Sequence, residues 1–116
     1  MDPITVFISK ALICFASVCH PVLLGSDTKA GTYTLNVLHT QQPGYGGDVL
    51  MYDSNATTVF AIHRTYVTER VQGRERLYHN TTPAQRRVTA GCVNVEPRIY
   101  EELKRSHVKR PLVIRE

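Results

Sequence analysis

The sequence predicts a mainly β fold with one helix in its C-terminal half and one long loop. Three observations favour this class. Short runs rich in β-branched and aromatic residues follow one another as far as Val67, separated by Gly, Asn, Ser and Pro. Apolar residues recur at helical spacing in one segment, which begins at Pro97. Between the two regions, Thr68 to Arg87 shows little periodic burial, which is typical of a functional or disordered loop.

Length, composition and charge limit the kind of protein. The chain has 116 residues, 42% of them hydrophobic, which suits one domain over residues 1–116. Three cysteines are too few for a small disulfide scaffold. Residues 1–58 hold 2 basic and 4 acidic side chains, whereas residues 59–116 hold 12 basic and 6 acidic ones. The second half is therefore expected to prefer an anionic partner.

The apolar N-terminal segment, Ile4 to Leu24, is expected to be folded protein rather than an export signal. Asp2 precedes the first cation, Lys10, which interrupts the apolar run, and no Ala-x-Ala cleavage site follows. Lys10 and His20 also argue against a membrane span. We expect neither a signal peptide nor a transmembrane segment here.

The first predicted element is a β-hairpin. Ile4 to Ile8 and Leu12 to Val18 have strand composition and flank a turn at Ser9-Lys10. In one continuous strand Cys14 and Cys19 would face opposite sides about 16 Å apart, too far for a disulfide. Both are expected to be buried thiols.

The elements that follow are predicted from alternation and spacing. The run from residue 32 to 37 alternates, which predicts a strand with Tyr33, Leu35 and Val37 on one buried face. After Pro97, which suits a first helical turn, Ile99, Tyr100 and Leu103 predict the buried side of a helix. Further strands are predicted at Val49 to Tyr52, Thr58 to His63, from Val88, and at Pro111 to Ile114 as an edge or terminal strand.

Cys92 is the candidate nucleophile. It follows a glycine, leaves a predicted strand and precedes the helix N-terminus, whose dipole would favour a thiolate. A core thiol in a turn is the alternative. His63 is the candidate base, because it ends an apolar strand that would hold it rigidly. His79, in the long loop, is the alternative base, because cysteine and histidine partners meet in space rather than along the chain.

The segment Thr89-Ala90-Gly91-Cys92-Val93-Asn94, with Ile62-His63 upstream and a helix and Pro-Leu-Val-Ile downstream, resembles the catalytic signature of bacterial L,D-transpeptidases. These enzymes are cysteine acyltransferases of peptidoglycan. Residues 27–33 look like the family's Thr-Pro-x-Gly-x-Tyr/Phe turn, and residues 44–47 like the glycine-rich segment of one branch. The likeness covers about residues 28–114, in matching order.

The segment departs from the family's pattern at four places. Ala90 replaces the histidine usual before Gly-Cys, Lys29 replaces a proline, and Arg64 replaces a small residue. The spacer of 28 residues between His63 and Cys92 is longer than usual, which suggests a lid.

The resemblance implies a β-sandwich or open barrel of the L,D-transpeptidase type, acting through a Cys92 thioester. The donor would be a peptidoglycan tetrapeptide stem, cleaved between a meso-diaminopimelate centre and D-alanine. An amine acceptor would give a 3→3 cross-link or amine exchange, and water would give carboxypeptidase cleavage. The resemblance also implies the periplasm or cell envelope, and no cofactor or metal is expected.

Catalytic roles are expected for Cys92, His63, Gly91 and Thr89. The N–H groups of Gly91 and Cys92 are the candidate oxyanion donors. Thr89 is expected to bond the motif or to orient His63, and the resemblance implies the Arg64 carbonyl as an alternative partner of the imidazole. Tyr45 and Asn94 are placed at the substrate site, where Asn94 would brace the turn rather than react.

Arginines are expected to recognise the carboxylates of stem peptides. Arg64 and Arg87 are favoured, because they lie nearest the reactive pair in sequence; the others are expected individually to solvate a loop. The full set is Arg64, Arg70, Arg74, Arg76, Arg86 and Arg87.

Two other functions stay open. An inactive relative would bind peptidoglycan without chemistry, and a disulfide-bonded or buried Cys92 would favour it. A small basic module would bind nucleic acid or an anionic surface through residues 70–87 and 104–110. No nucleic acid is expected, since the chain lacks a zinc pattern, a phosphate loop and an RNA-recognition signature, and only 8% of its residues are aromatic.

Overall fold

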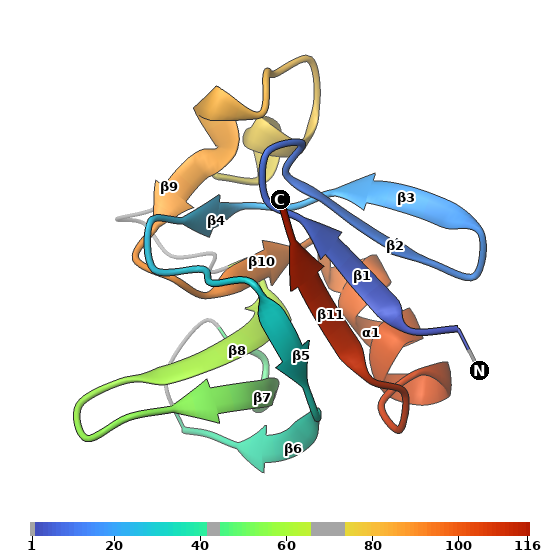
Figure 1. The fold of residues 1–116 in the computed structure, drawn as a ribbon, viewed down its shortest axis with the longest axis vertical. Coiled ribbons are helices and arrows are strands. Elements are labelled where there is room, and N and C mark those ends of the chain that lie inside the picture. Colours follow the sequence, from blue (N-terminus) through green and yellow to red (C-terminus); the bar gives the residue numbers. More distant parts are fainter. Residues whose placement is uncertain (1, 42–44, 66–73) are drawn as a thin grey trace.

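The computed structural model describes residues 2–41, 45–65 and 74–116. It confirms the mainly β fold class. The described strands form three sheets, and one α-helix lies in the C-terminal half of the chain (Figure 1).

The largest sheet joins the two ends of the chain. Its five strands have the order β3-β2-β1-β11-β5, in which β11 runs parallel to β1 and antiparallel to β5 (Figure 1). The predicted C-terminal strand therefore exists but is not an edge strand, since it is hydrogen-bonded on both sides. The strands are β1 (Ile4–Phe7), β2 (Leu12–Phe15), β3 (Val18–Pro21), β5 (Gly31–Tyr33) and β11 (Leu112–Arg115).

The second sheet has the order β10-β8-β7-β6, and β10 runs parallel to β8. A third, two-stranded sheet pairs β4 with β9. Gly25 in β4 permits this pairing, because a Cβ there would lie 1.8 Å from the Thr89 carbonyl oxygen. The strands are β4 (Leu24–Gly25), β6 (Asn36–His39), β7 (Asp48–Ser54), β8 (Val59–Arg64), β9 (Arg87–Thr89) and β10 (Val93–Val95).

The strand predicted over residues 32–37 is wrong. β5 ends at Tyr33, β6 begins at Asn36, and the two strands belong to different sheets. Leu35 is buried between them, whereas Val37 is 39% exposed. Because the chain changes sheet at this point, the alternation does not continue on one face.

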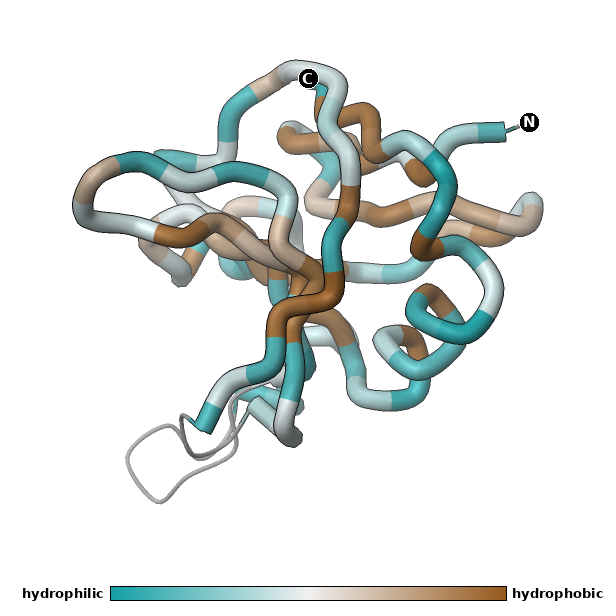
Figure 2. Tube along the Cα trace, turned by 90° about the horizontal axis from the view of Figure 1, so that it is seen from below, coloured by the Kyte–Doolittle hydropathy of each residue, from teal (hydrophilic) through white to brown (hydrophobic). Residues whose placement is uncertain are grey.

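The core lies between the sheets and helix α1 (Pro97–Ser106). As predicted, Ile99, Tyr100 and Leu103 form the buried side of this helix, which begins at Pro97. They pack in one cluster with residues of both larger sheets. Figure 2 shows hydrophobic stretches of the chain passing through the interior and hydrophilic ones on the outer loops. No helix within the described ranges is long and apolar enough to cross a membrane.

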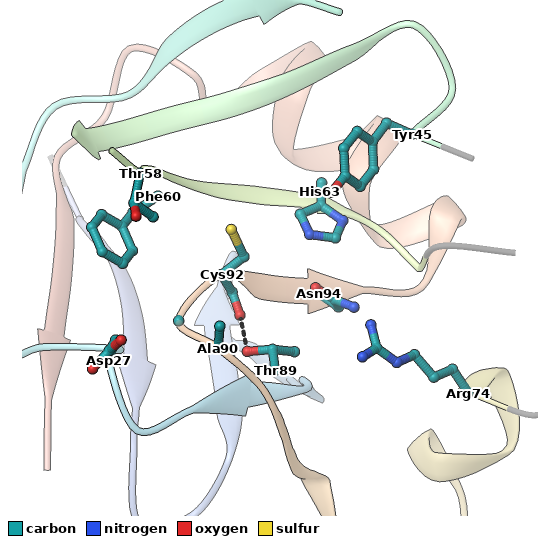
Figure 3. A pocket seen from close by; sticks show the side chains of 11 residues that line it. Asp27, Tyr45, Thr58, Phe60, His63, Arg74, Thr89, Ala90, Cys92 and Asn94 are labelled. Carbon is teal, nitrogen blue, oxygen red and sulfur yellow. Dashed lines mark hydrogen bonds between the residues drawn. The ribbon is translucent and has the colours of Figure 1, made fainter. Parts of the chain in front are cut away.

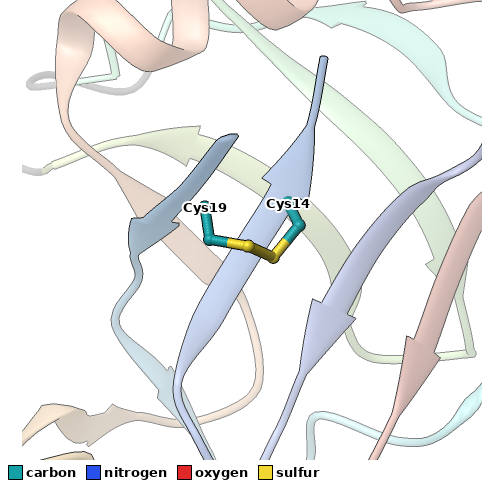
Figure 4. Close-up of a disulfide and its surroundings, with 2 residues drawn as sticks. All are labelled: Cys14 and Cys19. Atoms are coloured by element: carbon teal, nitrogen blue, oxygen red, sulfur yellow. A yellow bond between two sulfur atoms is a disulfide. The ribbon is translucent and has the colours of Figure 1, made fainter. Parts of the chain in front are cut away.

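Cys14 and Cys19 form a disulfide, so the prediction of two buried thiols is wrong (Figure 4). The chain reverses between them, because Ala16 and Ser17 both have positive φ angles of 50° and 64°. Such angles at both central residues are typical of a two-residue hairpin turn. The turn places Cys14 opposite Cys19 on neighbouring strands, with 4.0 Å between their Cα atoms. An Ala-Ser pair carries none of the Asn-Gly signal by which this turn is usually predicted.

Removing the disulfide is expected to lower the free energy of unfolding by about 2 kcal/mol, as loop-closure entropy predicts for so short a ring. The melting temperature should fall by several degrees. The measurement is thermal unfolding of wild type and of Cys14→Ser/Cys19→Ser, each with and without reductant. Reductant should lower the wild-type melting temperature to that of the variant and leave the variant unchanged. Equal melting temperatures without reductant would contradict the prediction.

The predicted long loop, residues 68–87, holds more structure than expected. Its first part, up to residue 73, lies outside the described residues, and the lid interpretation of that part remains a prediction. The 3-10 helices η2 (Arg74–Tyr78) and η3 (Ala84–Arg86) follow. Tyr78 is buried with its hydroxyl 2.7 Å from Thr65 Oγ1. Arg86 is also buried and donates to the carbonyl oxygens of Lys10 and Ala11, so this arginine holds the fold instead of solvating a loop.

Candidate active site

The pairing of β8 with β10 brings the predicted nucleophile and base together. In this parallel pair Asn94 lies opposite His63, and Cys92 comes two residues before Asn94. Because side chains two apart share a face, Cys92, Asn94 and His63 point to the same side (Figure 3). Ile62 and Val93, which precede His63 and Asn94 on the two strands, point to the opposite side, into the core. The sheet therefore holds a thiol, an imidazole and an amide on one surface.

The Cys92 thiol is free and half-buried. Burial raises its pKa, and a backbone hydrogen bond with Ala61 only partly offsets this effect. The predicted thiolate at a helix N-terminus is therefore wrong. β10 separates Cys92 from helix α1, so the thiol does not lie at the positive end of the helix dipole. Burial thus favours the neutral thiol over the thiolate, and a thiol needs a base to react.

His63, the predicted base, lies on the same face as the Cys92 thiol. Its Nδ1 lies 2.7 Å from the Arg64 carbonyl oxygen, which accepts only, so Nδ1 carries the proton and Nε2 is the acceptor. Burial lowers the pKa of His63; the bond to Arg64 opposes this shift, and the charge of Arg74 adds to it. The imidazole is therefore neutral at neutral pH. The Tyr45 ring packs against it with 4.6 Å between ring centroids.

Alkylation of Cys92 by iodoacetamide should increase with pH, with a midpoint above the ordinary cysteine pKa of about 8.5. Burial disfavours the thiolate, so its reactive form accumulates only at higher pH. Intact-mass kinetics between pH 6 and 10 measure the rate, and Cys92 is the one thiol available because Cys14 and Cys19 are bonded. Urea-unfolded protein is the control and should show the ordinary midpoint. A midpoint below the ordinary value would mean that the fold stabilises a thiolate.

The Gly91-Cys92 peptide has a defined orientation. The Gly91 carbonyl oxygen accepts hydrogen bonds from Thr28 Oγ1 (2.8 Å) and Tyr52 OH (3.3 Å). Because described peptides are trans and planar, the Cys92 N–H points away from these two donors. Among the described residues, neither the Gly91 nor the Cys92 N–H donates a hydrogen bond. Both groups are available as oxyanion donors.

Gly91 and Thr89 shape the turn that presents Cys92. A Cβ on Gly91 would lie 2.8 Å from Phe60 Cε1 and 3.0 Å from Asp27 Cβ, so only glycine fits without displacement. The Thr89 hydroxyl donates to the Cys92 carbonyl oxygen at 2.7 Å (Figure 3). Thr89 is therefore engaged within the motif.

Arg64 points away from the thiol, which differs from its predicted role in carboxylate recognition. Successive side chains of a strand face opposite sides, so the residue after His63 lies on the far face of β8. Its guanidinium is ion-paired with Glu101 and with Asp48 (3.1 Å) and lies 4.0 Å from the centre of the Tyr100 ring. Arg64 contributes to the site indirectly: its carbonyl oxygen accepts from His63, and its Nη1 donates to the Tyr45 carbonyl oxygen at 2.8 Å.

Three other predicted residues are also placed differently. Arg87 is exposed on β9 and does not line the cavities beside Cys92. The alternative base His79 has a side chain that is 68% exposed and lies 3.9 Å from Glu96, outside both cavities. Asn94 does not brace the turn. Its side chain is fully buried, and neither its Nδ2 nor its Oδ1 has a hydrogen-bond partner among the described residues.

Two cavities meet at Cys92, His63 and Tyr45. The larger, of about 400 Å³, is mixed in character and includes Asn94 and the turn of the Cys92 motif, residues 89–92. The smaller, of about 290 Å³, is more apolar. Its other walls include Leu38, Val49, Val59 and Ala61 from β6, β7 and β8. The thiol is thus accessible from two sides.

The larger cavity contains two charged residues that the sequence did not single out: Asp27 was assigned no role, and Arg74 was one of six candidate arginines but not a favoured one. Asp27 and Arg74 both line it, on opposite sides of Cys92 (Figure 3). Asp27 precedes the residues that resemble the family's Thr-Pro-x-Gly-x-Tyr/Phe turn, and Arg74 is one of several arginines in an aperiodic loop. No local pattern distinguishes Arg74 from its neighbours, because its position depends on the fold, in which its Nη2 lies 3.4 Å from the Val88 carbonyl oxygen of β9. Within the described residues, no group of three or more His, Cys, Asp or Glu is arranged to hold a metal ion.

The fold resembles that of a known enzyme, whereas the sequence matches no known family. No protein-family model matches the chain, and no curated protein matches its sequence. Among solved structures, the fold is similar to that of an L,D-transpeptidase from Mycobacterium smegmatis, with a TM-score of 0.61 and 13% sequence identity. The similarity covers 97% of this chain and 57% of that enzyme, so the chain spans little more than half of its length. At this identity the match establishes the type of fold and nothing finer.

Proposed function

We propose that this protein is a cysteine acyltransferase that acts on peptidoglycan tetrapeptide stems through a Cys92 thioester. The observation that carries the proposal is the shared face of β8 and β10, on which a free thiol and a neutral, oriented imidazole lie beside two cavities. The similar fold agrees with the resemblance of the sequence around Cys92 to L,D-transpeptidases, and the proposed substrate class and envelope location follow from that resemblance. Cys92 is neither disulfide-bonded nor fully buried, which speaks against an inactive relative.

The proposed reaction starts from a neutral Cys92 thiol and a neutral His63 imidazole. His63 Nε2 takes the thiol proton as sulfur attacks the carbonyl carbon, since the thiol and the imidazole both begin neutral. The N–H groups of Gly91 and Cys92 stabilise the oxyanion, at about 3 kcal/mol of barrier for each donor. The C–N bond then breaks, and His63 gives its proton to the leaving amine. A thioester and a free amino acid result.

The second cavity favours transfer over hydrolysis. An acceptor amine must reach the thioester while the acyl group still occupies the donor site. The smaller cavity contacts Cys92 and His63 from the side of β6 and β7, so it offers such a route. His63 would take the proton from the acceptor amine as the new amide forms.

The test is mass analysis of disaccharide-tetrapeptides incubated with the folded protein, whose Cys92 thiol is first verified as free. Cross-linked dimers, or exchange of the terminal residue for an added D-amino acid, would establish transfer. Tripeptide alone would establish a carboxypeptidase. Unchanged substrate, without a thioester adduct in the intact mass, would contradict the proposal.

A further inference from the structure

The larger cavity carries opposite charges at its two ends. We propose that these charges set the direction in which a peptide lies across Cys92, with its terminal carboxylate toward Arg74 and a side-chain ammonium toward Asp27. The inference rests on the proposed function and specifies which groups of the substrate the site selects.

Arg74 provides the cationic end. It is partly buried in η2 and lines the cavity. Its one described hydrogen bond, from Nη2 to the Val88 carbonyl oxygen, is 3.4 Å long. Within the described residues no carboxylate lies within ion-pair distance of its guanidinium. A planar guanidinium with unused N–H groups matches a carboxylate in geometry and charge.

Asn94 is an independent sign of a polar ligand beside Arg74. Its amide is fully buried, lines the cavity and lies between Cys92 and Arg74 (Figure 3). Both of its polar atoms lack partners among the described residues, and leaving such groups unpaired is costly. A peptide group carries one N–H and one C=O, which complement Asn94 Oδ1 and Nδ2. A peptide bound between Cys92 and Arg74 would satisfy both atoms.

Asp27 provides the anionic end. Its backbone N–H donates to the Ala90 carbonyl oxygen at 3.0 Å, which holds Asp27 against the nucleophile's turn. Its carboxylate forms no ion pair with a described residue. A third cavity, of about 140 Å³, adjoins the larger cavity at Asp27 and is lined in part by Asp53 and Lys29. The carboxylates of Asp27 and Asp53 outnumber the single ammonium of Lys29, so this end of the cavity has a net negative charge and suits a cationic group.

The direction agrees with the proposed chemistry. Figure 3 shows His63 and Arg74 on the same side of Cys92, opposite Asp27. The leaving amine must depart on the side of His63, which protonates it. In a tetrapeptide stem the leaving group is one amino acid with a free carboxylate, which Arg74 would hold. The acyl part carries the diaminopimelate side chain, whose terminal carbon bears an ammonium and a carboxylate. The ammonium would extend toward Asp27, with Lys29 of the adjoining cavity available to the carboxylate.

Binding to Cys92→Ala protein tests this inference without chemistry. The probes are a tetrapeptide stem, its C-terminal amide, and the stem acetylated on its side-chain amine, measured by calorimetry. In the Cys92→Ala parent, amidation and acetylation should each weaken binding about tenfold, the loss of one charge-assisted contact. Adding Arg74→Gln should abolish the difference between acid and amide, and adding Asp27→Asn should abolish the effect of acetylation. Arg76→Gln, an exposed neighbour in η2, is the matched control and should preserve both differences.

The results separate this inference from the proposed function. If Arg74→Gln retains the preference for acid over amide, or the parent shows none, the direction is overturned, even where wild type turns the peptide over. Charge-dependent binding with no turnover by wild type would uphold the direction and overturn acyl transfer. Absence of binding by all three probes would overturn both.

Discussion

Cys92→Ala should abolish thioester formation and lower turnover by at least about 10³-fold, because no other described side chain offers sulfur at this position. The fold should persist. The half-buried thiol makes only weak polar contacts, with the Val59 carbonyl oxygen at 3.6 Å from Sγ and with the backbone of Ala61, so its loss should cost about 1 kcal/mol or less. Intact mass after incubation with a tetrapeptide measures the adduct, and thermal unfolding measures stability.

The matched control for Cys92 is the pair of disulfide-bonded cysteines. Cys14→Ser/Cys19→Ser removes the disulfide on the far hairpin and should leave turnover at the wild-type level below its melting temperature. If Cys92→Ala retained turnover, or if the disulfide variant lost it while folded, the assignment of the nucleophile would be wrong.

His63 should be the second most sensitive position. His63→Ala should lower kcat/KM by about 10² to 10⁴-fold, the usual contribution of a general base, whereas His79→Ala should stay within about twofold of wild type. The reason is placement: His63 lines both cavities beside the thiol, and the exposed His79 lines neither. Steady-state kinetics on a tetrapeptide measure both variants.

Because His63 is only 5% exposed, its removal can also disturb packing. His63→Gln keeps most of the volume and retains a donor for the Arg64 carbonyl, but it cannot act as a base. It should lose activity as severely as His63→Ala while melting near the wild-type temperature. Equal losses in the His63 and His79 variants would refute the assignment of the base.

Several features were predictable because they depend on short stretches of chain. The spacing of Ile99, Tyr100 and Leu103 indicated the buried side of helix α1, and Pro97 indicated its start. The apolar run that ends at His63 indicated a strand, which the structure shows as β8. In each case the pattern repeats over a few residues, and burial of one face follows directly from it.

Other features required knowledge of what packs opposite. Cys14 and Cys19 looked unpairable until the turn at Ala16 and Ser17 placed them on neighbouring strands. Arg64 looked like a substrate ligand because it adjoins His63 in sequence, yet strand geometry directs it to helix α1. Arg74 looked like one loop arginine among several, and the fold places it in the cavity.

The sequence alone therefore determined the mainly β class, the helix and the identity of a thiol and an imidazole suited to acyl chemistry. The tertiary structure decided which residues share the site: it set Cys92, His63 and Asn94 on one face, placed Asp27 and Arg74 at opposite ends, and excluded His79 and the Arg64 side chain. The physical reason is the range of the interactions. Periodic burial acts over a few residues, whereas strand register and loop packing join residues whose separation in sequence says nothing about their distance in space.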